Sequence, residues 1–110
     1  MNWKVILFET TRKEKKPVEK FILSLEKSSL PKIAHVVDLL ETYGNLLRMP
    51  YSRKVTKEIF ELRIRGIEEV RILYTFGKEG KIYLLHGFKK KKEKTPKSEI
   101  ILAEARLDKI

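Results

Sequence analysis

The sequence predicts an α+β fold in which two N-terminal helices pack on a twisted antiparallel sheet and a C-terminal helix follows. Two observations predict it. Apolar residues recur at helical spacing in the first part of the chain, and after Gly44 they alternate with charged residues, which is typical of strands. Hydrophobic residues make up 42% of the 110 residues, which is enough to form a core without disulfides. We therefore expect one domain over residues 1–110.

The first strand is expected at Trp3–Phe8. Apolar residues then recur at i, i+3, i+4 and i+7 from Val18, directly after Pro17, which predicts an amphipathic helix that begins near the proline. A second helix is expected from about Pro31 to Gly44, where the glycine would form the C-cap. A short turn between the two runs predicts a helical hairpin on one face of the sheet.

Three strands are expected in the second half of the chain. Apolar and charged residues alternate strictly in Phe60–Arg65, so this strand has one buried and one charged face. Val70–Phe76 is the next strand, and Gly77–Gly80 has the composition of a turn. Ile82–Phe88 is almost continuously apolar, which places it centrally in the sheet. Thr95–Pro96 is typical of an N-cap and first helical residue, so a last helix is expected after it.

Composition limits the kinds of function. The net charge of +10 favours a polyanionic partner, because binding phosphates releases counterions; a role in solubility alone is the alternative. The absence of cysteine excludes a disulfide scaffold and thiolate chemistry. No secretory signal is recognisable at the N-terminus, and no apolar stretch reaches the roughly 20 residues of a membrane span. We therefore expect a cytoplasmic protein.

Metal chemistry is disfavoured, and no cofactor is expected. The chain has two aspartates, at helical positions far from the arginines, and two histidines that are 51 residues apart. Two-metal sites need clustered carboxylates. Only the glutamates between Glu58 and Glu69 would supply such a cluster.

Strand register predicts an arginine face. Because apolar residues must match across the first hairpin, a loop of three or of five residues places Arg63, Arg65 and Arg71 on the same open side. Like charges on neighbouring strands are destabilising, so a sheet that tolerates them is expected to bind an anion there. The alternative is a solvated face on which neighbouring carboxylates neutralise the arginines. Those carboxylates are Glu61, Glu68 and Glu69.

His86 and the lysine run after it extend this hypothesis. With a four-residue loop Gly77–Gly80, His86 pairs with Arg71 and joins the arginine face, whereas a five-residue loop points it into the core. Histidine is suited to proton transfer near neutral pH. Lysines 89 to 92 leave the same strand and favour phosphate contacts, although a lysine run is also typical of a solvated loop.

RNA cleavage without a metal needs a base for the 2′-hydroxyl, an acid for the leaving 5′-oxygen, and cations at the phosphate. The candidate catalytic residues are Glu61, Arg63, Arg71, His86 and Lys89. The candidate RNA-binding residues are Lys54, Lys57, Arg65, Lys90, Lys91 and Lys92.

The segments Phe60–Arg65, Val70–Tyr74, Leu84–Lys91 and Thr95–Pro96 together resemble the phage-derived, HigB-like branch of the RelE/ParE toxin superfamily. The resemblance extends over nearly the whole chain. It implies a RelE-like fold and a monomeric toxin within a complex with a helix-turn-helix antitoxin. It also implies cleavage of mRNA on the ribosome through a 2′,3′-cyclic phosphate.

The resemblance also carries over to single residues. Arg71 matches a functional arginine of RelE-type toxins, Arg63 falls where that type has a catalytic lysine, and the lysines after Phe88 match a basic site. The sequence departs from the family in having Glu61 where another lysine is expected, and in lacking a tyrosine in the last helix. ParE-like relatives share the fold and inhibit DNA gyrase. Gyrase inhibition and a degenerate nucleic-acid-binding role are therefore the alternatives.

Overall fold

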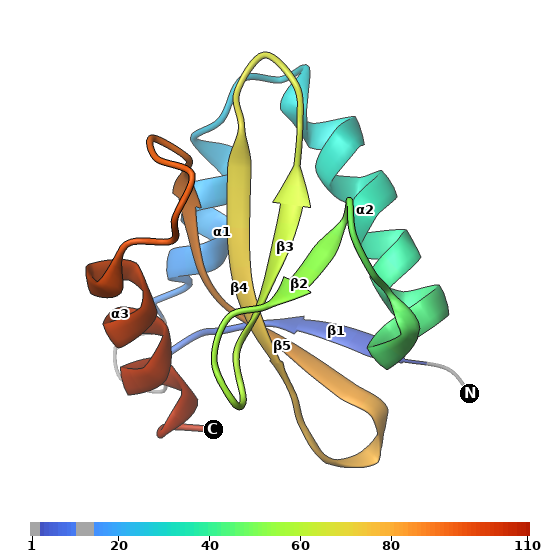
Figure 1. Ribbon diagram of the computed structural model, residues 1–110, viewed down its shortest axis with the longest axis vertical. Coiled ribbons are helices and arrows are strands. Elements are labelled where there is room, and N and C mark those ends of the chain that lie inside the picture. The colour runs from blue at the N-terminus through green and yellow to red at the C-terminus, as the bar shows by residue number, and fades with distance from the viewer. Residues whose placement is uncertain (1–2, 11–14) are drawn as a thin grey trace.

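Five strands form one sheet in the order β1-β5-β4-β3-β2, with three helices around it (Figure 1). The computed structural model describes residues 3–10 and 15–110. The strands are β1 (Lys4–Leu7), β2 (Ser52–Lys54), β3 (Phe60–Ile64), β4 (Val70–Phe76) and β5 (Lys81–Lys89). The helices are α1 (Pro17–Leu23), α2 (Ser29–Tyr43) and α3 (Lys97–Leu107). Short 3₁₀ turns lie at Gly44–Leu46 and Lys78–Gly80.

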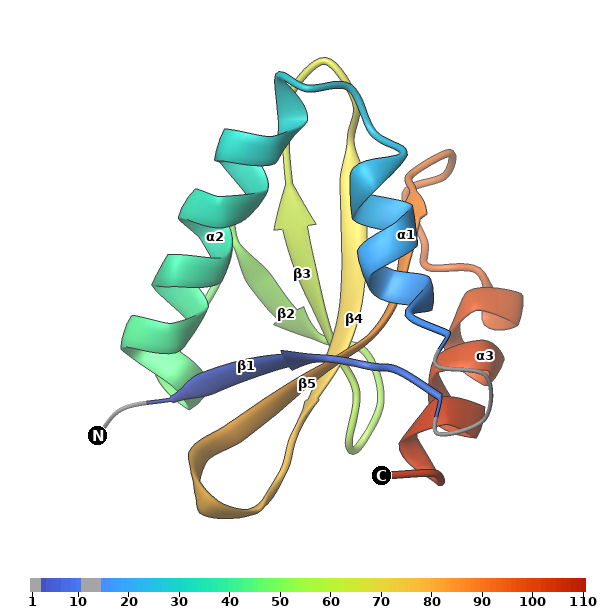
Figure 2. The same cartoon turned by 180° about the vertical axis from the view of Figure 1, so that it is seen from behind.

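The predicted helical periodicity of the first half is confirmed. Pro17 is the first residue of α1, where its missing N–H costs nothing. α2 ends at Gly44, whose φ of 51° lies in the left-handed region that favours glycine. Both helices lie on the same side of the sheet (Figure 2), and each has a buried apolar stripe. Within the described part of the chain, no helix has the length and hydropathy needed to cross a membrane.

The expectation of an antiparallel sheet is wrong at one edge. β2, β3, β4 and β5 form an antiparallel meander, but β1 pairs in parallel with β5, so the sheet is mixed. The long connection from β1 through α1 and α2 permits either strand direction at that edge, and hydrophobic periodicity does not encode the direction. The three-residue strand β2 was not predicted, because three residues are too few to show alternation.

The sheet face towards α1 and α2 forms the core. Leu62, Ile64, Ile72 and Tyr74 are almost fully buried, as the alternation predicts. At Gly87, opposite Ile72, an added Cβ would lie 2.4 Å from a ring carbon of Phe21. This glycine therefore lets α1 approach the sheet closely.

The other face of the sheet carries the charged residues. Arg63 pairs with Arg71, as the hairpin register predicts, and both side chains therefore point away from the α1/α2 layer. In the second hairpin Phe76 pairs with Ile82, which corresponds to the five-residue loop. A register shift between Leu73 and Tyr74 then places His86 opposite Leu73. A five-residue loop alone would point His86 into the core, but the extra residue at the register shift places it on the face of Arg71.

Candidate functional site

Three neighbouring strands each place one arginine on the face opposite α1 and α2. Arg53 comes from β2, Arg63 from β3 and Arg71 from β4. Arg53 pairs with Glu61 across β2 and β3, and Arg63 pairs with Arg71 across β3 and β4. Paired residues share a face, so the three guanidinium groups surround the carboxylate of Glu61. We call these four residues the arginine cluster.

Glu61 is the centre of the arginine cluster. Its Oε1 lies 3.3 Å from Nε of Arg53, 3.7 Å from Nε of Arg71 and 3.9 Å from Nε of Arg63. Its Oε2 accepts a hydrogen bond of 2.5 Å from the hydroxyl of Thr95. Glu61 is only 2% exposed. A buried carboxylate with this many cationic groups and donors around it fixes the position of those groups.

The arginines are not fully neutralised by this carboxylate. Three positive groups and one negative group leave the cluster with a charge of +2. Nη1 of Arg71 donates to the carbonyl of Val70, but the buried Nη2 of Arg71 and Nε of Arg63 have no hydrogen-bond partner in the described part of the chain. Buried donors in proteins normally have partners. The cluster therefore has the charge to bind an additional anion, and its two unpartnered donors are enclosed, so an anion would reach them only after the side chains around them move.

Burial changes the expected role of Arg71. Its side chain was expected on an open face, but the residue is 2% exposed and its Nε lies 3.7 Å from Oε1 of the buried Glu61. Burial is the main cause that lowers the pKa of Arg71, and the positive charge of Arg63 lowers it further. A guanidinium nevertheless keeps its proton near neutral pH. Arg71 is thus a buried, fixed positive charge at the base of the cluster. The exposed fraction of the side chain rises from 3% at Arg71 to 10% at Arg63 and 41% at Arg53.

The salt-bridge alternative applies to part of the face only. Glu61 does pair with the arginines, but Glu68 and Glu69 pair with lysines instead. Glu68 Oε1 lies 2.9 Å from Nζ of Lys89, and its other oxygen accepts hydrogen bonds from Ser29 and from the backbone of Glu26. The hydrogen bond from Lys89 is the main cause that holds the pKa of Glu68 below its usual value.

The candidate lysines divide into three groups. Lys90 bridges Glu69 and Glu93 at 3.2 Å and 3.0 Å, so like Lys89 it is engaged in ion pairs. Lys91 and Lys92 are exposed after β5, and Lys91 lines a pocket of about 340 Å³ beside Phe88. Lys54 lies over the ring of Phe60 at 5.9 Å, on the opposite face from the arginine cluster.

Lys54, a candidate RNA-binding residue, does not lie on the face of the arginine cluster, because it pairs with Phe60. In β2 the alternation gives the place beside Glu61 to Arg53, one residue earlier. Lys57 is exposed in the turn before β3, and Arg65 is exposed just after β3 ends.

His86 lies on the face of Arg71 but is engaged by α3. Its Nε2 is 2.8 Å from Oε1 of Glu99, and its Nδ1 is 3.4 Å from Nη1 of Arg106, which also donates to the carbonyl of Leu85. These contacts attach α3 to β5. A proton transfer by His86 would first require release from Glu99. Among residues 3–10 and 15–110, no three His, Asp or Glu side chains are grouped so that they could hold a metal ion.

Sequence reasoning missed Arg53 and Thr95. Arg53 is in a strand too short to show a pattern, although its alternation with Ser52 and Lys54 is visible once the strand is known. Thr95 was predicted to cap the last helix. Instead α3 begins at Lys97 without a side-chain cap, and the Thr95 hydroxyl donates to Glu61, 34 residues away in sequence. Helix-cap preferences are local and do not predict such a tertiary contact.

The mixed sheet, three helices and arginine cluster define a small α+β protein with a cationic site on one sheet face. The family model described as "Phage derived protein Gp49-like (DUF891)" matches residues 20–108, and the chain belongs to this family. The family is toxin-like and is related to the RelE/HigB-type toxins. A search of curated proteins found no match.

Proposed function

We propose that the protein is the toxin of a type II toxin–antitoxin pair and a metal-independent endoribonuclease that cuts mRNA on the ribosome. The observation that carries the proposal is the arginine cluster, with its charge of +2 and its unpartnered donors on Arg63 and Arg71. Membership of a toxin-like family supports the biological role.

The cluster suits the charge changes of RNA cleavage. The 2′-oxygen attacks the adjacent phosphorus, the bond from phosphorus to the 5′-oxygen breaks, and the products are a 2′,3′-cyclic phosphate and a 5′-hydroxyl. The 2′-hydroxyl proton goes to a base, and the 5′-oxygen receives a proton from an acid. The phosphoryl oxygens gain negative charge in the transition state, and donors that are already in place stabilise this charge. We assign that role to Arg63 and Arg71.

Glu61 is assigned a positioning role. It is buried and holds three arginines and Thr95, so it orients guanidinium groups and does not carry protons between reacting atoms. His86 lies on the face of the cluster and suits proton transfer, but it is held by Glu99, which RNA binding would have to displace. Lys89 was also a candidate, but it pairs with Val70 on the opposite face and is held there by Glu68.

The proposed partner is a cognate helix-turn-helix antitoxin. A protein of net charge +10 with a cationic face is neutralised most directly by an acidic segment that covers the cluster or blocks ribosome entry. The proposed place of action is the cytoplasm, where ribosomes translate.

Induced expression in a bacterial host, followed by mapping of mRNA 5′ ends, tests the proposal. We expect new 5′-hydroxyl ends within translated regions and none in a reporter whose start codon is removed. An Arg63→Gln variant should produce few ends, and a Lys78→Gln variant, which removes an exposed charge at the β4–β5 turn, should behave as wild type. Growth arrest with a DNA-damage response and no new mRNA ends would overturn the proposal in favour of gyrase inhibition.

A further inference from the structure

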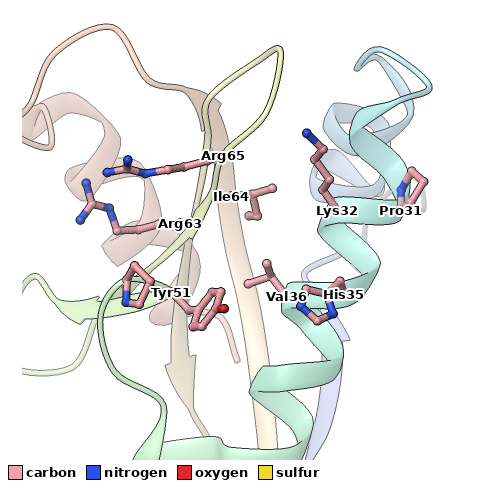
Figure 3. Close-up of a pocket in the computed structure, with 9 residues that line it drawn as sticks. Pro31, Lys32, His35, Val36, Tyr51, Arg63, Ile64 and Arg65 are labelled. Carbon is pink, nitrogen blue, oxygen red and sulfur yellow. The ribbon is translucent and has the colours of Figure 1, made fainter.

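A groove of about 470 Å³ runs between α2 and the edge of β3. Val36 from α2 and Ile64 from β3 face each other across its floor, and the ring of Tyr51 extends towards α2 at one side (Figure 3). The lining is mostly apolar. Pockets of about 300–1,000 Å³ with apolar walls are typical of small-ligand sites.

The groove is surrounded by positive charge. Lys32, Arg63 and Arg65 contribute to its lining, together with His35, and no carboxylate does. Among residues 3–10 and 15–110, the side chains of Lys32, His35 and Arg65 have no ion-pair or hydrogen-bond partner, which leaves them for a ligand. Arg63 and Arg65 line the groove from the β3 side, and their side chains point away from α2, so their charges lie beyond its rim (Figure 3).

The edge of β3 also offers backbone polar groups. The N–H of Arg63 donates to the carbonyl of Tyr51 at 2.7 Å, which shows that alternate residues of β3 point their amides to this side. β2 pairs only as far as Leu62, so the strand edge at Arg65 has no neighbouring strand. Within the residues that the structure describes, the backbone N–H and C=O of Arg65, directly after β3, have no hydrogen-bond partner and lie beside the groove.

We propose that this groove binds one nucleobase of single-stranded RNA next to the phosphate held by the arginine cluster. This inference rests on the proposed function. Arg63 belongs to both sites: the residue lines the groove, and its Nε is part of the cluster. An RNA strand whose phosphate meets Arg63 therefore has an adjacent base within reach of the Tyr51 ring. Stacking on an aromatic ring and a free backbone donor–acceptor pair are the contacts by which proteins bind unpaired bases.

The charge pattern favours RNA over a protein ligand. Lys32 and Arg65 lie at the same end of the groove, since Lys32 reaches Gly66, the residue after Arg65, and their charges suit a phosphate of the bound strand. A protein segment with alternating acidic and apolar residues is the competing occupant and is an outcome of the test.

The test is an NMR titration of the full chain with adenosine 3′-monophosphate and, separately, with inorganic phosphate. We expect the nucleotide to shift the amides of Val36, Tyr51 and Arg65, and phosphate to shift only the arginine cluster. Tyr51→Ala should weaken nucleotide binding by about 5- to 150-fold, the loss of one stacked base, and leave phosphate binding unchanged. Tyr51→Phe should bind as wild type. Tyr43→Ala, which removes an exposed tyrosine outside the groove, is the matched control.

A second variant keeps the test decisive if Tyr51→Ala does not fold. His35→Trp fills the groove from the exposed side of α2 and should also block the nucleotide. The proposal would be overturned if the nucleotide and inorganic phosphate shifted the same amides and all of these belonged to the arginine cluster. The proposal would also be overturned if the groove amides did not shift with the nucleotide but did shift with a peptide of alternating glutamate and leucine. Because binding is measured without cleavage, a bound nucleotide with no RNase activity would overturn only the proposed function.

Discussion

Replacing Glu61 by glutamine removes one charge from the centre of the arginine cluster without changing the shape of the side chain. Arg71 and Arg63, whose side chains are 3% and 10% exposed, would then face each other without their counterion. Removing one partner of a buried ion pair costs about 3–5 kcal/mol. The pair with Arg53 adds little to this figure, because that side chain is 41% exposed and its charge is screened by water.

We expect Glu61→Gln to lower the free energy of unfolding by about 3–5 kcal/mol, a large part of the roughly 5–15 kcal/mol of a typical domain. Inorganic phosphate should restore more stability to this variant than to wild type, because an anion that binds only the folded state stabilises it and would here replace the lost carboxylate. Urea unfolding measures both effects, with sodium chloride of equal ionic strength as the salt control. Glu104→Gln, at an exposed position of α3, is the control variant.

Two results would refute this reasoning. One is a Glu61→Gln protein that unfolds within about 1 kcal/mol of wild type, which is the ordinary range of a point mutation and would mean that the arginines need no counterion. The other is a phosphate effect no greater than that of chloride, which would mean that the cluster has no anion site.

Three further predictions concern the surroundings of the site. Thr95→Val should lower the free energy of unfolding in urea by about 1–3 kcal/mol, because Glu61 loses its hydroxyl donor. Thr95→Ser keeps the hydroxyl and should be as stable as wild type. Equal stabilities of the valine and serine variants would show that the hydrogen bond to Glu61 is not needed. Gly87→Ala should cost about 1–3 kcal/mol, because the added methyl meets the Phe21 ring, whereas Gly66→Ala meets only the flexible end of Lys32 and should be near neutral; equal costs would contradict the packing of α1. The lowered pKa of Glu68 means that it contributes stability above its ordinary value of 4.5, and that this contribution is lost as the pH falls through the lowered folded value. The Glu68→Gln variant should therefore lose less stability than wild type between pH 5 and the acid range, and parallel pH profiles would speak against the Lys89 contact.

Periodicity was sufficient to predict most of the fold. The helical run after Pro17, the alternation of β3 and the Arg63–Arg71 pairing each follow from the requirement that apolar residues share one face. The direction of β1 was not predictable, because β1 joins the sheet through a long helical connection. The position of His86 depends on one extra residue in β5, and neither loop length nor composition indicates it.

The site was predicted in part. Arg63, Arg71 and Glu61 were identified from one hairpin, where local register is enough. The contributions of Arg53 and Thr95 come from segments distant in sequence, and they depend on how the chain crosses the sheet face. The burial of Arg71 has the same cause, since a strand pattern shows which face a residue occupies but not what covers it.

Single-turnover cleavage of ribosome-bound mRNA by folded variants tests the central claim most directly. Arg71→Lys keeps a positive charge but loses the planar fork and the free Nη2 donor, so we predict a rate lower by about 10²–10³-fold with a KM close to wild type. Unfolding curves recorded in parallel distinguish a lost donor from a lost fold, and Lys78→Gln should cleave as wild type. Cleavage by Arg71→Lys at the wild-type rate would show that the arginine cluster is a structural ion network and not the site of RNA cleavage.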